Sequence, residues 1–424
     1  MPLDTSPQAV PSVNTRRHIV DAAIIGGGIA GGALAIVLRR AGLDVALIER
    51  EPRFRDRIRG EAVHPWGVRE ANALGLRPLL DAAGAIELPC WTRYRDAVAG
   101  EPYAWRDDFP DSPGELSVGH PVLQETLLTA ARDEGARVWR PATATPARTA
   151  DGWEIAIASD EEAATLATPL LIGADGQRSS VRRLIGGAAM RDPIHHAMGG
   201  VLARGVDLPR DSAHQAYHPA GFGMVFPQRD DLSRVYYVCS TDESRALQMS
   251  GPDAFLTRVA ALYPEGAFAR ATPAGPMGFF PNADLVTDRV AAPGAVLIGD
   301  AASANDPSQG HGLSLVFRDV RVLGDLLTGD TPLAEVPDRF EEKRASYYGV
   351  VREHARWAAP LVAEDSARAD ALRAQVERAR EADPSAGGFA GIFATGPDGL
   401  AVDDRARMHF YGEDLPGATV FDAP

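Results

Sequence analysis

The sequence predicts an α/β protein with a nucleotide-binding domain, an inserted β-sheet domain and a helical C-terminal region. Three observations support this prediction. Residues 21–49 read as strand, glycine turn, helix and strand, residues 191–289 consist mainly of short strand-like runs, and residues 331–424 return to helical periodicity. We expect the nucleotide-binding domain to cover 18–90, 118–190 and 290–330, and the sheet domain to cover 91–117 and 191–289.

Composition narrows the function classes. The chain has 424 residues and a formal net charge of −15, which argues against nucleic-acid binding. Cys90 and Cys239 are too few for a disulfide framework, and no metal-ligand spacing occurs, so we expect no metal. No apolar run approaches a membrane span of about 20 residues. Residues 1–17 are polar and lack an apolar stretch, so we expect a loose tail. The low cysteine count and the net charge predict a cytoplasmic, soluble protein. We expect it to be a monomer or a homodimer.

The stretch from Asp21 to Glu49 predicts a Rossmann-type dinucleotide-binding unit. Gly26, Gly28 and Gly31 follow an apolar strand with G-x-G-x-x-G spacing, and a helix-prone run and a second strand follow them. Gly26 permits the tight turn, Gly28 allows a pyrophosphate to approach the backbone, and Gly31 lets the helix pack on the strand. Glu49 ends the second strand, where an acid can accept ribose hydroxyl groups.

Two further strand ends carry small and acidic residues. An apolar strand over 170–173 runs into Asp175 and Gly176, where small residues suggest that backbone approaches a ligand. A second buried strand ends at Asp300, in the position where open α/β sheets bind ligands. Downstream, Gly310 and Gly312 leave N–H groups near the start of a long helix.

An arginine-rich segment follows Glu49. Five arginines lie between Arg50 and Arg59, and the segment ends in Gly60-Glu61. A solvated loop is the default interpretation of such a segment. Beside a pyrophosphate site, some of these arginines could instead neutralise phosphate.

Taken in order, the three glycine and acid motifs resemble those of the single-component FAD-dependent aromatic hydroxylase superfamily, which has the para-hydroxybenzoate hydroxylase fold. The resemblance covers roughly residues 18–330 and implies resident FAD, with NADH or NADPH as a donor that has no domain of its own. His120 stands where the family usually has a flavin-contacting arginine. The resemblance, with the motifs above, implies these FAD-binding residues: Gly26, Gly28, Ile29, Ala30, Gly31, Glu49, Arg50, Arg59, His120, Asp175, Gly176, Asp300, Pro307, Gly310, Gly312 and Leu313.

The same resemblance implies a monooxygenase. NAD(P)H would reduce FAD, and a flavin hydroperoxide would pass one oxygen atom of dioxygen to an aromatic or polycyclic small molecule, by hydroxylation or epoxidation. His311 or His218, or else His196, could act as a base towards a phenol, and the Pro307 loop could exclude water. A packing or surface role is the alternative for each histidine. We expect substrate contacts from Arg204, Tyr217 and Phe226.

Two alternatives remain open. An FAD-dependent reductase or oxidase, similar to the geranylgeranyl reductases, would use the same motifs without oxygen insertion. A flavin halogenase would need a lysine directly before Gly60 and a Trp-x-Trp motif, but Arg59 occupies that position and no such motif occurs. A flavin-binding protein without turnover is the other class.

Overall fold

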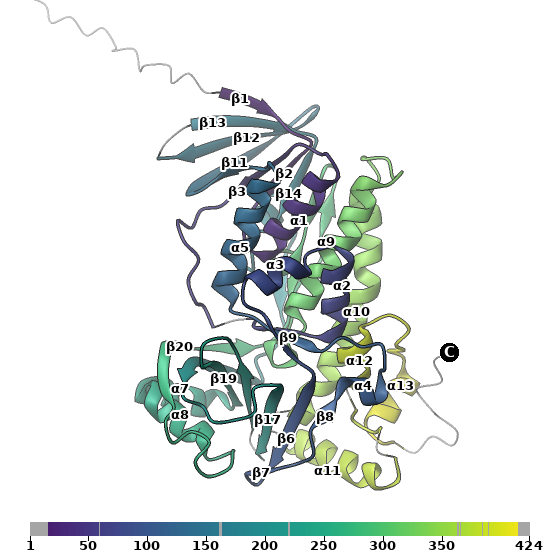
Figure 1. The fold of residues 1–424 in the computed structure, drawn as a ribbon. Helices are drawn as coiled ribbons and strands as arrows, with labels where there is room; N and C mark the ends of the chain where they lie inside the picture. Colours follow the sequence, from purple (N-terminus) through teal and green to yellow (C-terminus); the bar gives the residue numbers. More distant parts are fainter. Residues whose placement is uncertain are drawn as a thin grey trace, which may run out of the picture.

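A six-stranded sheet forms the centre of the nucleotide-binding part of the chain (Figure 1). The computed structural model describes residues 16–58, 60–160, 163–218, 221–362, 364, 366–383, 385–388 and 390–413. Neighbouring strands pair in parallel except β22, which runs antiparallel to β23. The strand order is β10 (Arg137–Trp139), β3 (Val45–Ile48), β2 (Ala22–Ile25), β14 (Leu170–Gly173), β23 (Ala295–Leu297) and β22 (Ala291–Ala292).

Both faces of this sheet are buried, because its strands are apolar throughout. Ala22 and Ile24 of β2 belong to a core with the helices, whereas Ala23 and Ile25 belong to a core on the opposite face. Figure 1 shows the helices lying along the sheet. They are α1 (Ile29–Arg40), α5 (His120–Asp133), α9 (Gly312–Thr328) and α10 (Val336–Val362).

A second, four-stranded sheet covers the other face. It consists of β1 (Arg16–Ile19), β13 (Ala163–Thr168), β12 (Gly152–Ser159) and β11 (Ala142–Thr149), in that order. The acidic and alanine-rich composition of residues 159–168 predicts an exposed turn and edge, and this prediction is wrong for 163–168, which form an interior strand. Alternate residues Ala164, Leu166 and Thr168 are buried, and their modest hydrophobicity hides the pattern. Arg16 and Arg17 likewise belong to β1, while the rest of the expected tail lies outside the described residues.

The eight-stranded sheet unites two distant segments of the chain. Residues 90–104 supply three of its strands, and residues 196–282 supply the other five. The strand-like runs expected over 191–289 are present as strands, and two helices also occur within that range. The members are β6 (Cys90–Arg95), β7 (Val98–Ala99), β8 (Tyr103–Ala104), β16 (His196–Arg204), β17 (Ser212–His218), β18 (Gly221–Pro227), β19 (Leu232–Cys239) and β20 (Thr272–Asn282), with α7 (Thr241–Ser250) and α8 (Pro252–Ala260) packed beside them.

Small elements link the sheets, and the C-terminal region is helical as expected. No helix within the described ranges is long and apolar enough to cross a membrane. The linking strands are β4 (Ala62–Val63), β5 (Ile86–Leu88), β9 (Glu115–Ser117), β15 (Ala189–Arg191), β21 (Leu285–Thr287) and β24 (Ser303–Ala304). The remaining helices are α2 (Pro65–Ala73), α3 (Arg77–Ala82), α4 (Trp105–Asp108), α6 (Ser180–Leu184), α11 (Ala367–Ala382), α12 (Ala390–Thr395) and α13 (Asp404–Phe410), with short 3-10 turns η1 (Gly299–Ala301) and η2 (Pro307–Gln309).

Candidate FAD and substrate site

The turns that follow β2 and β14 touch each other at the carboxyl end of the central sheet. Gly26 has a φ of +106°, and a methyl group on it would lie 2.3 Å from the Ala174 carbonyl oxygen. A methyl group on Gly31 would lie 1.9 Å from the Gly26 carbonyl oxygen. Glycine is therefore required at both positions by backbone approach, as the spacing predicted.

The beginning of α1 is open to a ligand. Gly28 is the residue at its N-cap, so no N-cap side chain accepts a hydrogen bond from the first helical N–H groups. Among the residues that the structure describes, a methyl group on Gly28 would meet only the Gln124 side chain, 3.6 Å away. Ile29 and Ala30 begin the helix and are buried beneath this opening. The arrangement offers N–H donors and the positive end of a helix dipole to an anion.

Glu49 closes one side of the glycine turn. Its Oε2 accepts a hydrogen bond of 2.7 Å from the Gly27 N–H, and its Oε1 accepts one of 2.7 Å from the Glu51 N–H. These bonds hold the buried carboxylate in place and leave further lone pairs on both oxygens. Arg50 points outward, with its guanidinium 3.7 Å from Glu51. Arg59 lies outside the described residues.

The Asp175 and Asp300 motifs are linked to each other. Asp175 Oδ2 accepts hydrogen bonds from the N–H and hydroxyl of Ser180, at the beginning of α6. Its Oδ1 is buried and has no hydrogen-bond partner among the described residues. Gly176 has a φ of +77° with open space around it. Gln177 Nε2 donates a 3.4 Å hydrogen bond to Asp300 Oδ2.

The loop before α9 is held in position by His64. His64 Nε2 lies 2.9 Å from the Gln309 carbonyl oxygen, and His64 Nδ1 lies 2.9 Å from Glu115 Oε1. Gly310 has a φ of +68°, and a methyl group on it would lie 2.8 Å from His64 Nε2. Gly312 has open space around it, so this loop presents backbone rather than side chains. Pro307 begins the η2 turn of the same loop.

His120, Gly60 and Leu313 meet where the arginine-rich segment returns to the sheet. His120 Nδ1 lies 3.1 Å from the Gly60 carbonyl oxygen. A methyl group on Gly60 would lie 3.2 Å from His120 and 3.5 Å from Leu313. The structure therefore brings these two predicted cofactor residues together beside one glycine.

His311 does not join the eight-stranded sheet. Its ring is buried and stacked on Phe393 of α12, with centroids 5.1 Å apart and planes inclined by 20°. The edge contact to His64 has the same centroid distance of 5.1 Å. Burial, together with His64 and His354, lowers the pKa of His311 well below its usual range. Neither ring nitrogen has a hydrogen-bond partner among the described residues, so the ring is a neutral, packed side chain.

The three expected substrate contacts occupy different places. Phe226 is buried, with its ring 5.8 Å from that of Trp91. Tyr217 is 42% exposed and donates a 2.9 Å hydrogen bond to Gln215. Arg204 lies at the far end of β16 and donates to the Asp230 carbonyl oxygen, about 26 Å along the strand from His196. The side chain of His218 lies outside the described residues.

An apolar sheet face lies opposite the arginine-rich segment. Ile58 packs against it, because methyl groups on Gly200 and Gly278 would lie 2.5 Å and 2.8 Å from the Ile58 side chain. The face includes Met198, Phe222, Met224, Phe226, Tyr236 and Val238. Residues of this kind exclude water from a neighbouring site.

A buried ionic group anchors the arginine-rich segment to this sheet. Arg234 Nε donates a 3.0 Å hydrogen bond to Glu61 Oε1, and its Nη2 donates one of 2.7 Å to Asp56. The Tyr236 hydroxyl also donates to Glu61. Burial lowers the pKa of Arg234, but the charges of Glu61, Tyr236 and Asp56 raise it far above its usual range overall. Asp56 and Glu61 are therefore tied to β19.

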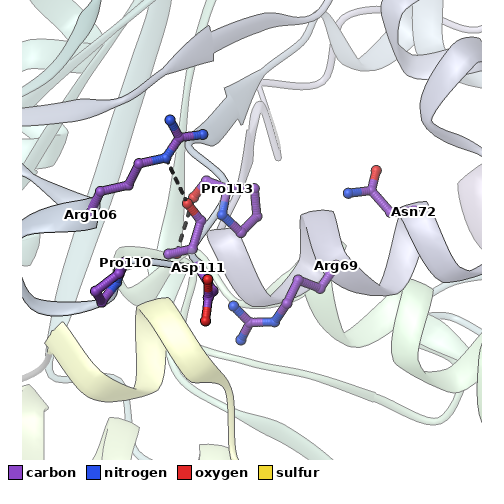
Figure 2. A pocket seen from close by; sticks show the side chains of 7 residues that line it. Arg69, Asn72, Arg106, Pro110, Asp111 and Pro113 are labelled. Carbon is purple, nitrogen blue, oxygen red and sulfur yellow. Dashed lines mark hydrogen bonds between the residues drawn. The ribbon is translucent and has the colours of Figure 1, made fainter.

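A cavity of about 370 Å³ lies on the outer side of α2. Figure 2 shows the side chains of Arg69 and Arg106 extending towards it from two different elements. Arg69 donates to the Ala394 carbonyl oxygen, and Arg106 donates to that of Ser112. This cavity is separate from the glycine turns described above, and no residue predicted for the site lines it.

Several site residues carry no sequence signal of their own. Gln124 faces Gly28, and Gln177 binds Asp300. Asp319 Oδ2 accepts a 2.8 Å hydrogen bond from the Gly299 N–H, which fixes the turn that carries Asp300. The only available signal for Asp319 is an acidic residue in α9 whose neighbours three and four positions away along the helix are apolar.

The residues present fit a dinucleotide cofactor. The open beginning of α1, the space over Gly28 and the unpartnered Asp175 Oδ1 each provide polar groups or room that the described side chains do not occupy. These features lie on turns that follow β2 and β14, at the carboxyl edge where open α/β sheets bind ligands.

Comparisons with known proteins agree with this geometry. A family model described as "FAD binding domain" matches residues 19–330. Squalene monooxygenase SE2 of Panax ginseng is 26% identical over 75% of this chain and 59% of its own length. The menaquinone reductase of Mycolicibacterium smegmatis is 26% identical over 80% of this chain and 84% of its own length.

Solved structures share the fold. A probable FAD-dependent monooxygenase from Pseudomonas aeruginosa superimposes with a TM-score of 0.70 at 20% sequence identity, over 81% of this chain and 97% of its own. The chain spans 54–60% of the length of the first three curated relatives that it matches. The expected fold class is confirmed.

Proposed function

We propose, from the premise that this chain belongs to the FAD binding domain family, that it is an FAD-dependent monooxygenase acting on an aromatic or polycyclic small molecule. FAD is its cofactor, and NADH or NADPH is the electron donor. The relationship to squalene monooxygenase supports oxygen insertion, by hydroxylation or epoxidation. The domain division into 18–90, 118–190 and 290–330 for FAD and 91–117 and 191–289 for substrate is part of the proposal.

The observation that carries the proposal is the meeting of the glycine and acid turns at one edge of the parallel sheet. The N–H groups at the start of α1 would bind the pyrophosphate across Gly28. Glu49, held by two backbone N–H groups, would accept the ribose hydroxyls of the adenosine. Asp300, oriented by Gln177, would accept hydroxyls of the ribityl chain.

The remaining groups would shape the reaction space. The Pro307–Gly312 loop, fixed by His64, would present its backbone to the flavin ring. When bound, FAD that NAD(P)H has reduced supplies the chemistry that activates dioxygen. The apolar face around Phe222 and Phe226 would bind the substrate rings and exclude water.

A test of the cofactor assignment uses purified protein. We expect flavin absorbance at a stoichiometry of one FAD per chain. The substitution Asp300→Ala should abolish this stoichiometric FAD, whereas Asp325→Ala, on the exposed side of α9, should retain it. Full FAD content in Asp300→Ala would remove Asp300 from the site.

A second test concerns turnover. NADH and NADPH oxidation is followed with a panel of phenols and polycyclic compounds, and products are weighed by mass spectrometry. A product that is one oxygen atom heavier than its substrate supports a monooxygenase. Bound FAD with no NAD(P)H oxidation across the panel would contradict enzymatic function.

A reductase is the second candidate function. The menaquinone reductase relative favours it, because that relative is matched over most of both chains. A reductase would consume NAD(P)H without adding oxygen, so its product mass would reflect added hydrogen only. Product mass therefore distinguishes the two candidates.

A further inference from the structure

Two arginines without an acidic partner line the cavity beside α2. Arg69 comes from α2 and Arg106 from the short helix α4, so two separate elements bring guanidinium groups to one space (Figure 2). Each has one hydrogen bond to the protein, from Arg69 to the Ala394 carbonyl oxygen at 2.7 Å and from Arg106 to that of Ser112 at 3.3 Å. Neither forms an ion pair with any residue that the structure describes. Most of the five N–H donors of each guanidinium therefore remain available to a ligand.

The acids nearest to Arg69 already bind other arginines. Glu70 accepts hydrogen bonds from Arg318 and Arg321, and Asp398 accepts two from Arg318, at 3.0 Å and 2.7 Å. Burial lowers the pKa of Arg69 and the charge of Arg318 adds to this shift, whereas Glu70 and Asp398 oppose it. An arginine stays charged at neutral pH even so. Arg69 is thus a half-buried cation that has lost part of its solvation and lacks a carboxylate of its own.

The opposite wall of the cavity is held by local bonds and prolines. The buried Ser112 donates its N–H to the Phe109 carbonyl oxygen at 2.8 Å and its hydroxyl to the Pro113 carbonyl oxygen at 3.1 Å. Pro110 and Pro113 both line the cavity, and a proline ring fixes the backbone φ angle. A wall held in this way loses little conformational freedom when a ligand binds, which favours affinity.

The size and the lining of the cavity restrict what it can hold. Its volume of about 370 Å³ exceeds that of a single carboxylate or phosphate group and falls within the range of about 300–1,000 Å³ that is usual for small-molecule sites. Asn72 adds an amide to the lining, and Asp111 adds an exposed carboxylate. A second negative group on a ligand would be repelled by Asp111. The lining therefore suits a molecule with one anionic end and an uncharged body.

We propose that this cavity binds a small organic anion, whose carboxylate or phosphate group contacts Arg69 and Arg106 and whose uncharged part packs on Pro110 and Pro113. Planar guanidinium groups bind both kinds of oxyanion through paired N–H donors. The chain has a formal net charge of −15, so an anionic ligand needs local cations of this kind. The site is separate from the proposed FAD site and does not depend on the oxygenase function.

The cavity adjoins elements that cover the Pro307–Gly312 loop. Arg69 joins α2 to α12 through its hydrogen bond to Ala394. The preceding residue, Phe393, is stacked on His311 at a centroid distance of 5.1 Å. An anion held by Arg69 would strengthen the contact between α2 and α12, because ligand binding to the folded state stabilises the structure that forms the site. Hydrogen exchange in α12 should therefore slow when the site is filled.

The first experiment measures binding by calorimetry. FAD-loaded protein is titrated at low ionic strength with phenyl phosphate and, separately, with benzoate, and the tighter probe identifies the class of oxyanion. We expect saturable binding of one molecule per chain. Arg69→Gln and Arg106→Gln should each weaken it about tenfold or more, because each removes a charged hydrogen-bond donor. Arg245→Gln loses the same charge on an exposed side chain of α7 and should match the wild type.

Folding does not obscure this comparison. Arg69→Gln changes the contact with Ala394, so its unfolding midpoint is compared with that of the wild type. Arg106 is exposed, so Arg106→Gln should keep the wild-type midpoint and tests the site even if Arg69→Gln is unstable. Binding that Arg106→Gln does not weaken would overturn the proposal. A wild type that binds neither probe would overturn it as well.

Two further measurements test the position and the nature of the ligand. Asp111→Asn should strengthen phenyl phosphate binding at least about twofold at low ionic strength, because a nearby negative charge is removed, and high salt should reduce the gain. Phenyl phosphate should also slow hydrogen exchange in α12 of the wild type but not of Arg69→Gln. Inorganic phosphate cannot pack on the proline wall and should bind more weakly than phenyl phosphate. Equal affinities of these two probes would overturn the assignment of an organic ligand.

Discussion

Two glycines of the first motif, Gly28 at the N-cap of α1 and Gly31 within the helix, play different physical roles. Gly31 is enclosed by the backbone of Gly26, at 1.9 Å from an added methyl group, whereas Gly28 has its nearest neighbour at 3.6 Å. A side chain at Gly31 would clash with backbone, and backbone moves aside only at a large cost in free energy. The space beside Gly28 is open and could hold a ligand.

We therefore predict opposite outcomes for two matched substitutions. Gly31→Ala should destabilise the apoprotein by about 1–3 kcal/mol through overpacking. Gly28→Ala should leave apoprotein stability nearly unchanged and weaken FAD binding at least about tenfold, because its methyl group would enter the space proposed for the pyrophosphate. Urea unfolding and FAD titration measure the two effects. Equal stability loss in both variants would contradict this division.

A buried acid gives stability a pH dependence. Burial raises the pKa of Asp284 to about 7, partly opposed by the Asp306 N–H and Arg352. A folded-state pKa above the unfolded value of about 3.9 means that the folded state holds the proton more tightly. This contribution to stability is fully present below about pH 4 and is lost as the pH rises to about 7.

Asp284→Asn should remove this contribution. The amide oxygen can still accept the Asp306 N–H. Between pH 5 and pH 8 the wild type should lose about 1 kcal/mol or more of its free energy of unfolding through Asp284, and the variant should not show this loss. Denaturant unfolding at both pH values measures the difference, with Asp288→Asn on the surface as the control. Parallel pH profiles for wild type and Asp284→Asn would exclude this origin.

At the scale of elements, the segment between β3 and β4 is a strap fastened to β19. Arg234 is 2% exposed and pairs with Glu61 and Asp56, so its removal would leave the buried Glu61 carboxylate and the partly buried Asp56 carboxylate without this counter-charge. Breaking a buried pair in this way costs far more than breaking an exposed one.

Arg234→Met should destabilise the protein by about 3–5 kcal/mol. Arg245→Met removes an exposed pair with Asp242 and should change stability by less than about 1 kcal/mol. Thermal or urea unfolding of both variants compares the two pairs. Similar small losses in both would show that the strap does not depend on Arg234.

The glycine and acid turns at the edge of the central sheet could be predicted from sequence, because each depends on residues adjacent in the chain. The spacing of Gly26, Gly28 and Gly31 predicts their turn, because that turn depends only on local backbone geometry. The partnership of Glu61 with Arg234 joins residues 173 positions apart, and local patterns contain no information about such a pair. His311 shows the same limit, since the ring that covers it, Phe393, belongs to a helix near the other end of the chain.

The contact of His195 and His196 with Asp306 could not be predicted from the sequence either. His195 and His196 are neighbours in sequence, and successive residues of a strand normally point to opposite faces. His195 precedes β16, so its ring can turn back to meet His196. Their partner Asp306 lies more than 100 positions later, and only the paired sheets reveal that contact.

At the scale of the whole molecule, packing is unevenly distributed. One large core surrounds α1, α5 and α9, whereas the cluster that joins α11 and α13 to α10 contains five buried residues. Helix α11 buries only Ala369 and Val376. Regions with few buried apolar contacts open at lower free energy than the core.

Native-state hydrogen exchange followed by mass spectrometry should show this gradient. Backbone amides of α11 should exchange at least about tenfold faster than those of α9 under conditions that report opening equilibria. Phe410→Ala, in the small cluster, should speed exchange in α11 and leave α9 unchanged. Uniform exchange across both helices would instead indicate one cooperative unit.

The two-segment origin of the eight-stranded sheet also has a consequence for biosynthesis. Strand β6 leaves the ribosome early, but its parallel partner β17 is made about 120 residues later. At roughly 5–20 residues per second, that strand edge waits roughly 6–24 s for its neighbour. During this interval a nascent chain exposes Trp91 and Tyr94 on an unpaired edge, and crowded polysomes bring such edges from adjacent chains together. Slower expression at lower temperature, or a chaperone that covers this segment, should therefore raise the yield of folded protein.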